Sequence, residues 1–66
     1  LGLLQELLRE LPQAQQDIVH LREIEGKSYK EIAETLGLSE EQVKVYLFRA
    51  RQRIKKRYAE IQGYGL

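Results

Sequence analysis

The stretch formed by residues 39–57, SEEQVKVYLFRARQRIKKR, decides the fold. Ser39 is a favourable helix N-cap, and Gln42 lies three residues later, where the second member of a capping box belongs. When the chain advances about 100° per residue, four apolar side chains of this stretch share one narrow stripe. These side chains are Val43, Leu47, Ala50 and Ile54. The stretch therefore predicts a long helix, over residues 40–60, that packs on a small core along one face.

The opposite face of this helix combines apolar and cationic side chains. Val45 and Phe48 point away from the stripe, and basic residues surround them. Lysine and arginine can donate to guanine edges or to phosphates, and apolar side chains can contact a thymine methyl group. We therefore expect this face to enter the major groove of DNA. A solvated basic helix end that merely complements the helix dipole is the alternative.

Charge is distributed unevenly along the 66 residues, whose formal net charge is only +1. Residues 1–42 hold four basic and nine acidic residues, whereas residues 43–66 hold seven basic residues and one acidic residue. The two segments therefore carry −5 and +6. This polarity favours an oriented encounter with a polyanion such as nucleic acid.

The composition excludes several classes of site. The chain has no cysteine and one histidine, His20, so it does not supply the ligands of a zinc module. Because neither a catalytic constellation nor a phosphate-cradling glycine loop is evident, we expect no enzyme and no bound cofactor. The longest apolar run is too short to cross a membrane, and the absence of cysteine fits a reducing compartment.

Two helices are expected in the first part of the chain. A first helix, over residues 2–10, is predicted by leucines at helical spacing and ends before Pro12. Pro12 suits the first turn of a second helix, over residues 12–25, and Gly26 can adopt the positive φ that ends it. The leucines of the first segment are Leu3, Leu4, Leu7, Leu8 and Leu11. The apolar residues on the inner face and flanks of the second helix are Ala14, Ile18, Val19, Leu21 and Ile24.

A third, short helix over residues 29–36 begins with a second capping box, formed by Ser28 and Glu31. Gly37 ends this helix, and Leu38 fills the turn before the long helix. Two capped helices separated by a tight glycine-containing turn form a helix-turn-helix. We therefore predict an all-α domain of four helices with a helix-turn-helix in its C-terminal half.

The ends of the chain complete this organisation. Because the chain starts without methionine and opens with a leucine-rich segment, we expect residues 1–66 to be a single-domain fragment of a longer chain. Residues 63–66 carry no periodicity, and we expect them to form a disordered tail.

The start of the third helix is a second candidate for contact with phosphate. Ser28 and Lys30 lie at this N-terminus, where exposed amides attract anions. Tyr29 shares its helical spacing with Ile32 and Leu36, so we expect it in the core.

Residues 11–57 resemble region 4 of a bacterial RNA polymerase sigma factor, and most closely the extracytoplasmic-function group. The features that carry the resemblance are the Leu11-Pro12 opening, the segment GKSYKEIA at residues 26–33 and the ending Phe48-Arg49-Ala50-Arg51. The resemblance implies recognition of the promoter −35 element by a domain that is tethered to core RNA polymerase in the cytoplasm. The chain departs from the family at Gln42, where many members have threonine, and at Val45-Tyr46, which puts the exact −35 sequence in doubt.

The resemblance also assigns roles to individual residues. Base-edge contacts fall to Lys44, Val45, Phe48 and Arg49. Arg49 and Lys44 can donate to guanine, whereas Phe48 can press on a thymine methyl group. The cations expected to contact phosphate and to add salt-sensitive affinity are Arg51, Arg53, Lys55 and Lys56.

The leucine-rich start leaves two alternatives open. Its leucines either close the core of the domain or dock on a partner. Sigma region 4 packs against the flap of the polymerase β subunit, and an anti-sigma factor can occupy the same surface. On resemblance and flanking position, the candidates for this interface are Leu7, Leu11, Val19 and Ile24.

Two other classes of function remain compatible with the sequence. A LuxR-type response-regulator output domain shares the helix-turn-helix pattern, but it would bind a palindromic site as a dimer. A helical protein-interaction module would use its basic face only for solubility. Loss of DNA selectivity on changing Lys44 and Arg49 would discriminate the DNA-binding functions from the interaction module.

Overall fold

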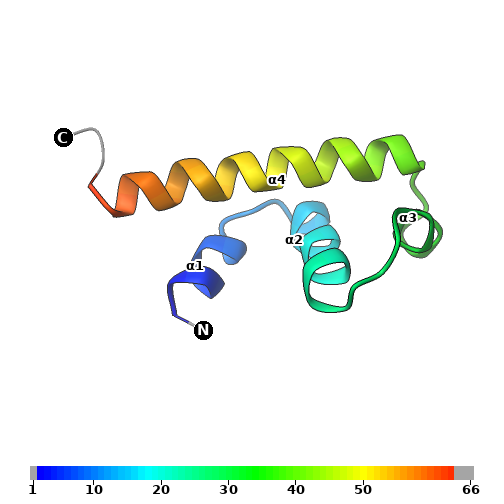
Figure 1. Cartoon of the computed structure of the whole chain (residues 1–66), viewed down its shortest axis with the longest axis horizontal. Helices are drawn as coiled ribbons and strands as arrows, with labels where there is room; N and C mark the ends of the chain where they lie inside the picture. Colours follow the sequence, from blue (N-terminus) through cyan, green and yellow to red (C-terminus); the bar gives the residue numbers. More distant parts are fainter. Residues whose placement is uncertain (1, 64–66) are drawn as a thin grey trace.

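The short helical segments of the chain lie along one side of a single long helix (Figure 1). The computed structural model describes residues 2–63. The elements are α1 (Leu3–Arg9), α2 (Gln13–Val19), the π-helix η1 (His20–Ile24), α3 (Tyr29–Leu36) and α4 (Glu40–Ile61). The domain measures 42 × 22 × 17 Å, because α4 runs along its full length. The predicted all-α fold, with a helix-turn-helix formed by α3 and α4, is confirmed.

The core lies beneath the first half of α4, where α2 and α3 pack against it. Val43, Leu47 and Ala50 of the predicted stripe are at most 1% exposed, whereas Ile54 is only partly buried. Ile18 and Ile32 complete the centre of the core, and neither side chain is exposed. Full burial of such a side chain stabilises a domain by about 1.5–3 kcal/mol. The hydrophobic stripe therefore fixes the N-terminal half of α4 more firmly than the C-terminal half.

Both predicted capping boxes are present. Ser39 Oγ accepts a hydrogen bond from Gln42 N–H at 3.0 Å, and Ser39 N–H donates to Gln42 Oε1 at 2.9 Å. The corresponding distances between Ser28 and Glu31 are 3.1 and 2.8 Å. The hydrogen bond from Ser28 N–H to the Glu31 carboxylate lowers the pKa of Glu31 below its ordinary value. These contacts set the first turns of α3 and α4.

The turn between α3 and α4 depends on a left-handed glycine. Gly37 has φ 69° and ψ 34°, a conformation that glycine adopts without a steric penalty. Leu38 N–H then donates to the Ala33 carbonyl at 2.9 Å, and the Leu38 side chain packs against the core. The turn therefore delivers Ser39 directly to the start of α4.

The second predicted helix is present, but it is not an α-helix throughout. Instead of one α-helix over residues 12–25, the structure has α2 followed without a break by the π-helix η1. Glu25 N–H donates to the His20 carbonyl at 3.1 Å, a bond that spans five residues. A π-helical turn holds more residues than an α-helical one, so side chains after Val19 depart from the predicted α-helical positions. Gly26, with φ 70°, ends the segment as expected.

The ends of the described chain are simple. Gly63 N–H donates to the Glu60 carbonyl at 3.1 Å and forms a turn after α4. The other residues of the expected tail, 64–66, lie outside the described residues. Among the helices within residues 2–63, none combines the length and apolar character needed to span a bilayer.

Candidate nucleic-acid interface

The first half of α4 presents an outward face that is not used for packing. Val45 is 43% exposed and Phe48 is 62% exposed, although both are large hydrophobic residues. Lys44 and Arg49, on either side of them, are exposed as well. The structure therefore brings together the four residues that were expected to contact bases. Neighbouring exposed apolar side chains with a polar rim fit an interaction surface.

Cations line both edges of this outward face. We name one edge the Arg51 flank, which consists of Lys44, Arg51 and Lys55, and the other the Arg53 flank, which consists of Arg49, Arg53 and Lys56. All six side chains belong to exposed residues. The major groove of B-DNA is about 12 Å wide and has a phosphate backbone on each side, and a helix of about 10–12 Å fills it. Each flank can therefore contact one of the two backbones.

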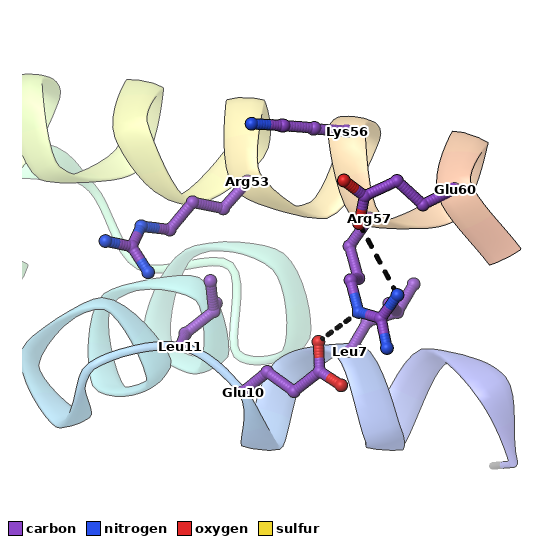
Figure 2. A pocket seen from close by; sticks show the side chains of 7 residues that line it. All are labelled: Leu7, Glu10, Leu11, Arg53, Lys56, Arg57 and Glu60. Carbon is purple, nitrogen blue, oxygen red and sulfur yellow. Dashed lines mark hydrogen bonds and ion pairs between the residues drawn. The ribbon is translucent and has the colours of Figure 1, made fainter. Parts of the chain in front are cut away.

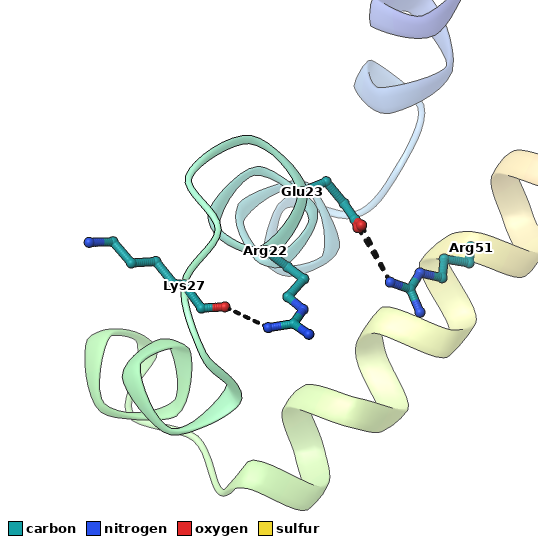
Figure 3. A network of polar contacts seen from close by, with 4 residues as sticks. All are labelled: Arg22, Glu23, Lys27 and Arg51. Carbon is teal, nitrogen blue, oxygen red and sulfur yellow. Dashed lines mark hydrogen bonds and ion pairs between the residues drawn. The ribbon is translucent and has the colours of Figure 1, made fainter.

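The two flanks differ in how far their charges are neutralised within the protein. On the Arg51 flank, Lys44 Nζ lies 3.6 Å from Glu41 Oε1, and Arg51 Nη2 lies 3.3 Å from Glu23 Oε2 (Figure 3). Within residues 2–63, no cation of the Arg53 flank forms an ion pair with an acidic side chain. The Arg53 flank is therefore open to an external anion, whereas the Arg51 flank is partly engaged.

Sequence reasoning missed Arg22, which the structure places beside the helix-turn-helix. Its Cζ lies 4.5 Å from the centroid of the Tyr29 ring, and Lys44 Nζ lies 5.8 Å from the same ring. Arg22 Nη1 also donates to the Lys27 carbonyl at 2.9 Å (Figure 3). This contact crosses the Gly26 turn, so no periodic pattern in the sequence indicates it. Arg22 therefore links η1 to α3, and Lys44 of α4 lies near the same Tyr29 ring.

The start of α3 lies beside the contact between Arg22 and Tyr29. Ser28 and Lys30 are exposed, as their expected contact with phosphate requires. Ser28 Oγ accepts from Glu31 N–H, which leaves the hydroxyl proton of Ser28 available to an acceptor oxygen. The Glu31 carboxylate occupies the N–H of Ser28, so part of the predicted anion site is already filled by the protein. Tyr29 packs half-buried against the core, as expected.

A groove separates α1 from the C-terminal half of α4 (Figure 2). Its volume is about 400 Å³, and Leu7 and Leu11 contribute its apolar surface. Arg53 and Lys56 of the Arg53 flank also line it, while Arg57 Nε donates to Glu10 Oε1 at 2.9 Å. This hydrogen bond is the main reason that the pKa of Arg57 is raised above its ordinary value. The groove is therefore cationic on one side and closed by an ion pair on the other.

The structure buries three of the four residues assigned to a partner interface. Leu7, Leu11 and Val19 are 4%, 5% and 7% exposed, because they close the core of the domain. A partner cannot bury side chains that the protein has already buried. Only Ile24 of this set is accessible, at 65% exposure. The leucine-rich start thus serves mainly the domain's own core, although Leu4 is 54% exposed.

Comparison with known proteins agrees with this arrangement. The family "Sigma-70, region 4" matches residues 1–54, which is more than half of the chain. No curated protein matches the sequence significantly. The family match confirms the resemblance to sigma region 4, and the structure supplies the helix-turn-helix of such a DNA-binding domain. The chain therefore belongs to the sigma-70 region 4 family.

Proposed function

We propose that this domain reads the −35 element of a promoter and holds that DNA against RNA polymerase as part of a sigma factor. The observation that carries the proposal is the exposure of Val45 and Phe48 between two cationic flanks of α4. Family membership supports the same function. The ending Phe48-Arg49-Ala50-Arg51 favours a sigma factor over a LuxR-type output domain, and the resemblance of residues 11–57 favours the extracytoplasmic-function group.

In the proposed complex, the N-terminal half of α4 lies in the major groove and α3 crosses the DNA backbone. Lys44 and Arg49 donate to base edges, while Val45 and Phe48 contact thymine methyl groups or sugars. At about 1.5 Å per residue, the 22 residues of α4 are about 33 Å long, far more than one groove crossing needs. The C-terminal half of α4 therefore runs out over the backbone.

Phosphate contacts orient the domain in this proposal. Ser28, Lys30 and Arg22 contact the backbone at the start of α3. Along α4 the backbone contacts come from the flank residues that do not read bases, namely Arg51, Arg53, Lys55 and Lys56. Lys55 and Lys56 contribute affinity that does not depend on sequence and that weakens as salt concentration rises. Base contacts then select among sites that all bind through phosphates.

The experiment that tests DNA reading compares two double variants that remove the same charge. A duplex enriched from a random library by the protein is compared with a scrambled duplex. Lys44→Ala with Arg49→Ala should abolish the preference for the enriched duplex, since each good base contact contributes about 1–3 kcal/mol of discrimination. Lys55→Ala with Lys56→Ala should weaken binding to both duplexes equally. It should also reduce the slope of log affinity against log salt concentration by about two. Identical behaviour of the two variants would refute the assignment of base and phosphate contacts.

Tethering to polymerase forms the second part of the proposal. The resemblance to sigma region 4 favours the flap of the polymerase β subunit as the partner. An anti-sigma factor would compete for the same surface. Ile24 supports such a contact because it is an apolar side chain that the domain leaves 65% exposed. Binding of a purified β-flap fragment should be saturable and should be lost in Ile24→Glu, but retained in Ile61→Glu. Failure of the unmodified chain to bind this fragment would contradict tethering through the flap.

A further inference from the structure

We propose that Glu23 competes with DNA phosphate for Arg51, so that DNA binding exchanges an ion pair within the protein for one with the backbone. The inference rests on the proposed DNA-binding function and deepens it. It assigns to Glu23, an acidic residue outside the helix-turn-helix, the role of a positioning residue that lowers the affinity of the domain for DNA.

The geometry of the pair permits this exchange. Arg51 Nη2 lies 3.4 Å from Glu23 Oε1 and 3.3 Å from Glu23 Oε2, so one nitrogen serves both oxygens (Figure 3). The two side chains are 55% and 44% exposed. The guanidinium group therefore keeps donors that point to solvent while the carboxylate holds it. A phosphate can approach Arg51 without any rearrangement of the core.

The position of Arg51 places this pair at one edge of the outward face of α4, the face that the proposed complex turns toward the DNA. Arg51 lies two turns after Lys44 and one turn before Lys55, on the same flank. Glu23 reaches it from η1, 28 residues earlier in the chain. A carboxylate at this place repels the incoming backbone and also occupies a cation that the backbone needs. Both effects lower affinity without reading any base.

The strengths of the two contacts indicate that, in the complex, Arg51 pairs with phosphate rather than with Glu23. An exposed ion pair favours the paired state by no more than about fivefold at equilibrium. A phosphate contact also releases counterions condensed on DNA, a gain that the intramolecular pair does not provide. Arg51 therefore leaves Glu23 on binding, and the lost pair reduces affinity by about two- to fivefold.

A second ion pair provides a matched control. Arg57 pairs with Glu10 at 2.9 Å and with Glu60 at 3.4 Å, again joining α4 to an acidic residue of the N-terminal half (Figure 2). This pair lies in the groove between α1 and α4, on the core side of the helix rather than beside the outward face. Glu10→Gln removes the same charge as Glu23→Gln beside a cation on the core side of α4, and that cation keeps its ion pair with Glu60.

The test measures binding of the chain to a 20-base-pair duplex of mixed sequence over a series of salt concentrations. Glu23→Gln should bind about two- to fivefold more tightly than Glu10→Gln, with an unchanged salt slope. Arg51→Ala should reduce the slope by about one, and the double variant Glu23→Gln with Arg51→Ala should show no gain over Arg51→Ala alone. A purely structural role of Glu23 would not produce this dependence on Arg51.

Three results would overturn the proposal. Equal tightening by Glu23→Gln and Glu10→Gln would assign the effect to net charge alone. A gain from Glu23→Gln that persists in the Arg51→Ala background would show that Arg51 is not the competing cation. Absence of duplex binding by all proteins, the unmodified chain included, would instead reject the proposed function and the exchange with it. Thermal unfolding of each variant verifies that it is folded during the measurement.

Discussion

The two halves of α4 are parts of one continuous helix, yet they are held in place by different forces. The N-terminal half is held by packing, since Val43, Leu47 and Ala50 are almost completely buried. The last turns of the C-terminal half lie over α1 (Figure 1), and Tyr58 and Ile61 remain 47% and 43% exposed. Close packing fixes side-chain positions far better than exposed ion pairs do. Sequence-specific contacts are therefore expected from the first half, and general electrostatic attraction from the second.

The largest expected effect tests whether packing stabilises the N-terminal half of α4 more than the C-terminal half. Leu47→Ala should cost about 2–5 kcal/mol, because it leaves a cavity under the recognition face. Ile61→Ala, on the same side of the helix four turns later, should cost at most about 1 kcal/mol. Chemical denaturation followed by circular dichroism measures both. Equal losses would show that the C-terminal half belongs to the same cooperative core.

A smaller effect tests the exposed aromatic residues of the two halves. Phe48 is 62% exposed in the free protein, and we expect the DNA to bury it in the complex. Phe48→Ala removes this burial and should therefore weaken binding to an enriched duplex about tenfold. Its effect on stability should stay within about 0.5 kcal/mol. Tyr58→Ala is the matched control, and we expect it to leave DNA affinity unchanged. A comparable loss of affinity in both variants would contradict the division of labour along α4.

Much of the fold follows from the sequence because its determinants are local. The stripe of α4, the Ser28 and Ser39 capping boxes and the Gly37 turn each depend on residues within a few positions of one another. The outward position of Val45 and Phe48 follows from the same periodicity. Local propensity and hydrophobic spacing agree throughout this part of the chain, which is why the helix-turn-helix could be predicted.

The remaining features depend on contacts between distant residues. Spacing could not show whether Leu7, Leu11 and Val19 would cover the domain's own core or a partner, because both destinations require the same apolar stripe. The pairing of Arg51 with Glu23 likewise joins residues that only the tertiary fold brings together. A cation in a sequence therefore does not reveal whether its charge is free.

Because η1 is π-helical, the number of residues between α2 and α3 matters as much as their identity. A deletion of one residue between His20 and Ile24 would restore α-helical spacing and change which side chains of this segment face Tyr29 and Arg51. The Arg22 contact with Tyr29 and the Glu23 contact with Arg51 would then be lost together, while the buried residues of α2 kept their places. Both contacts depend on the number of residues between α2 and α3. Relatives in which this connection is one residue shorter are therefore expected to lack both.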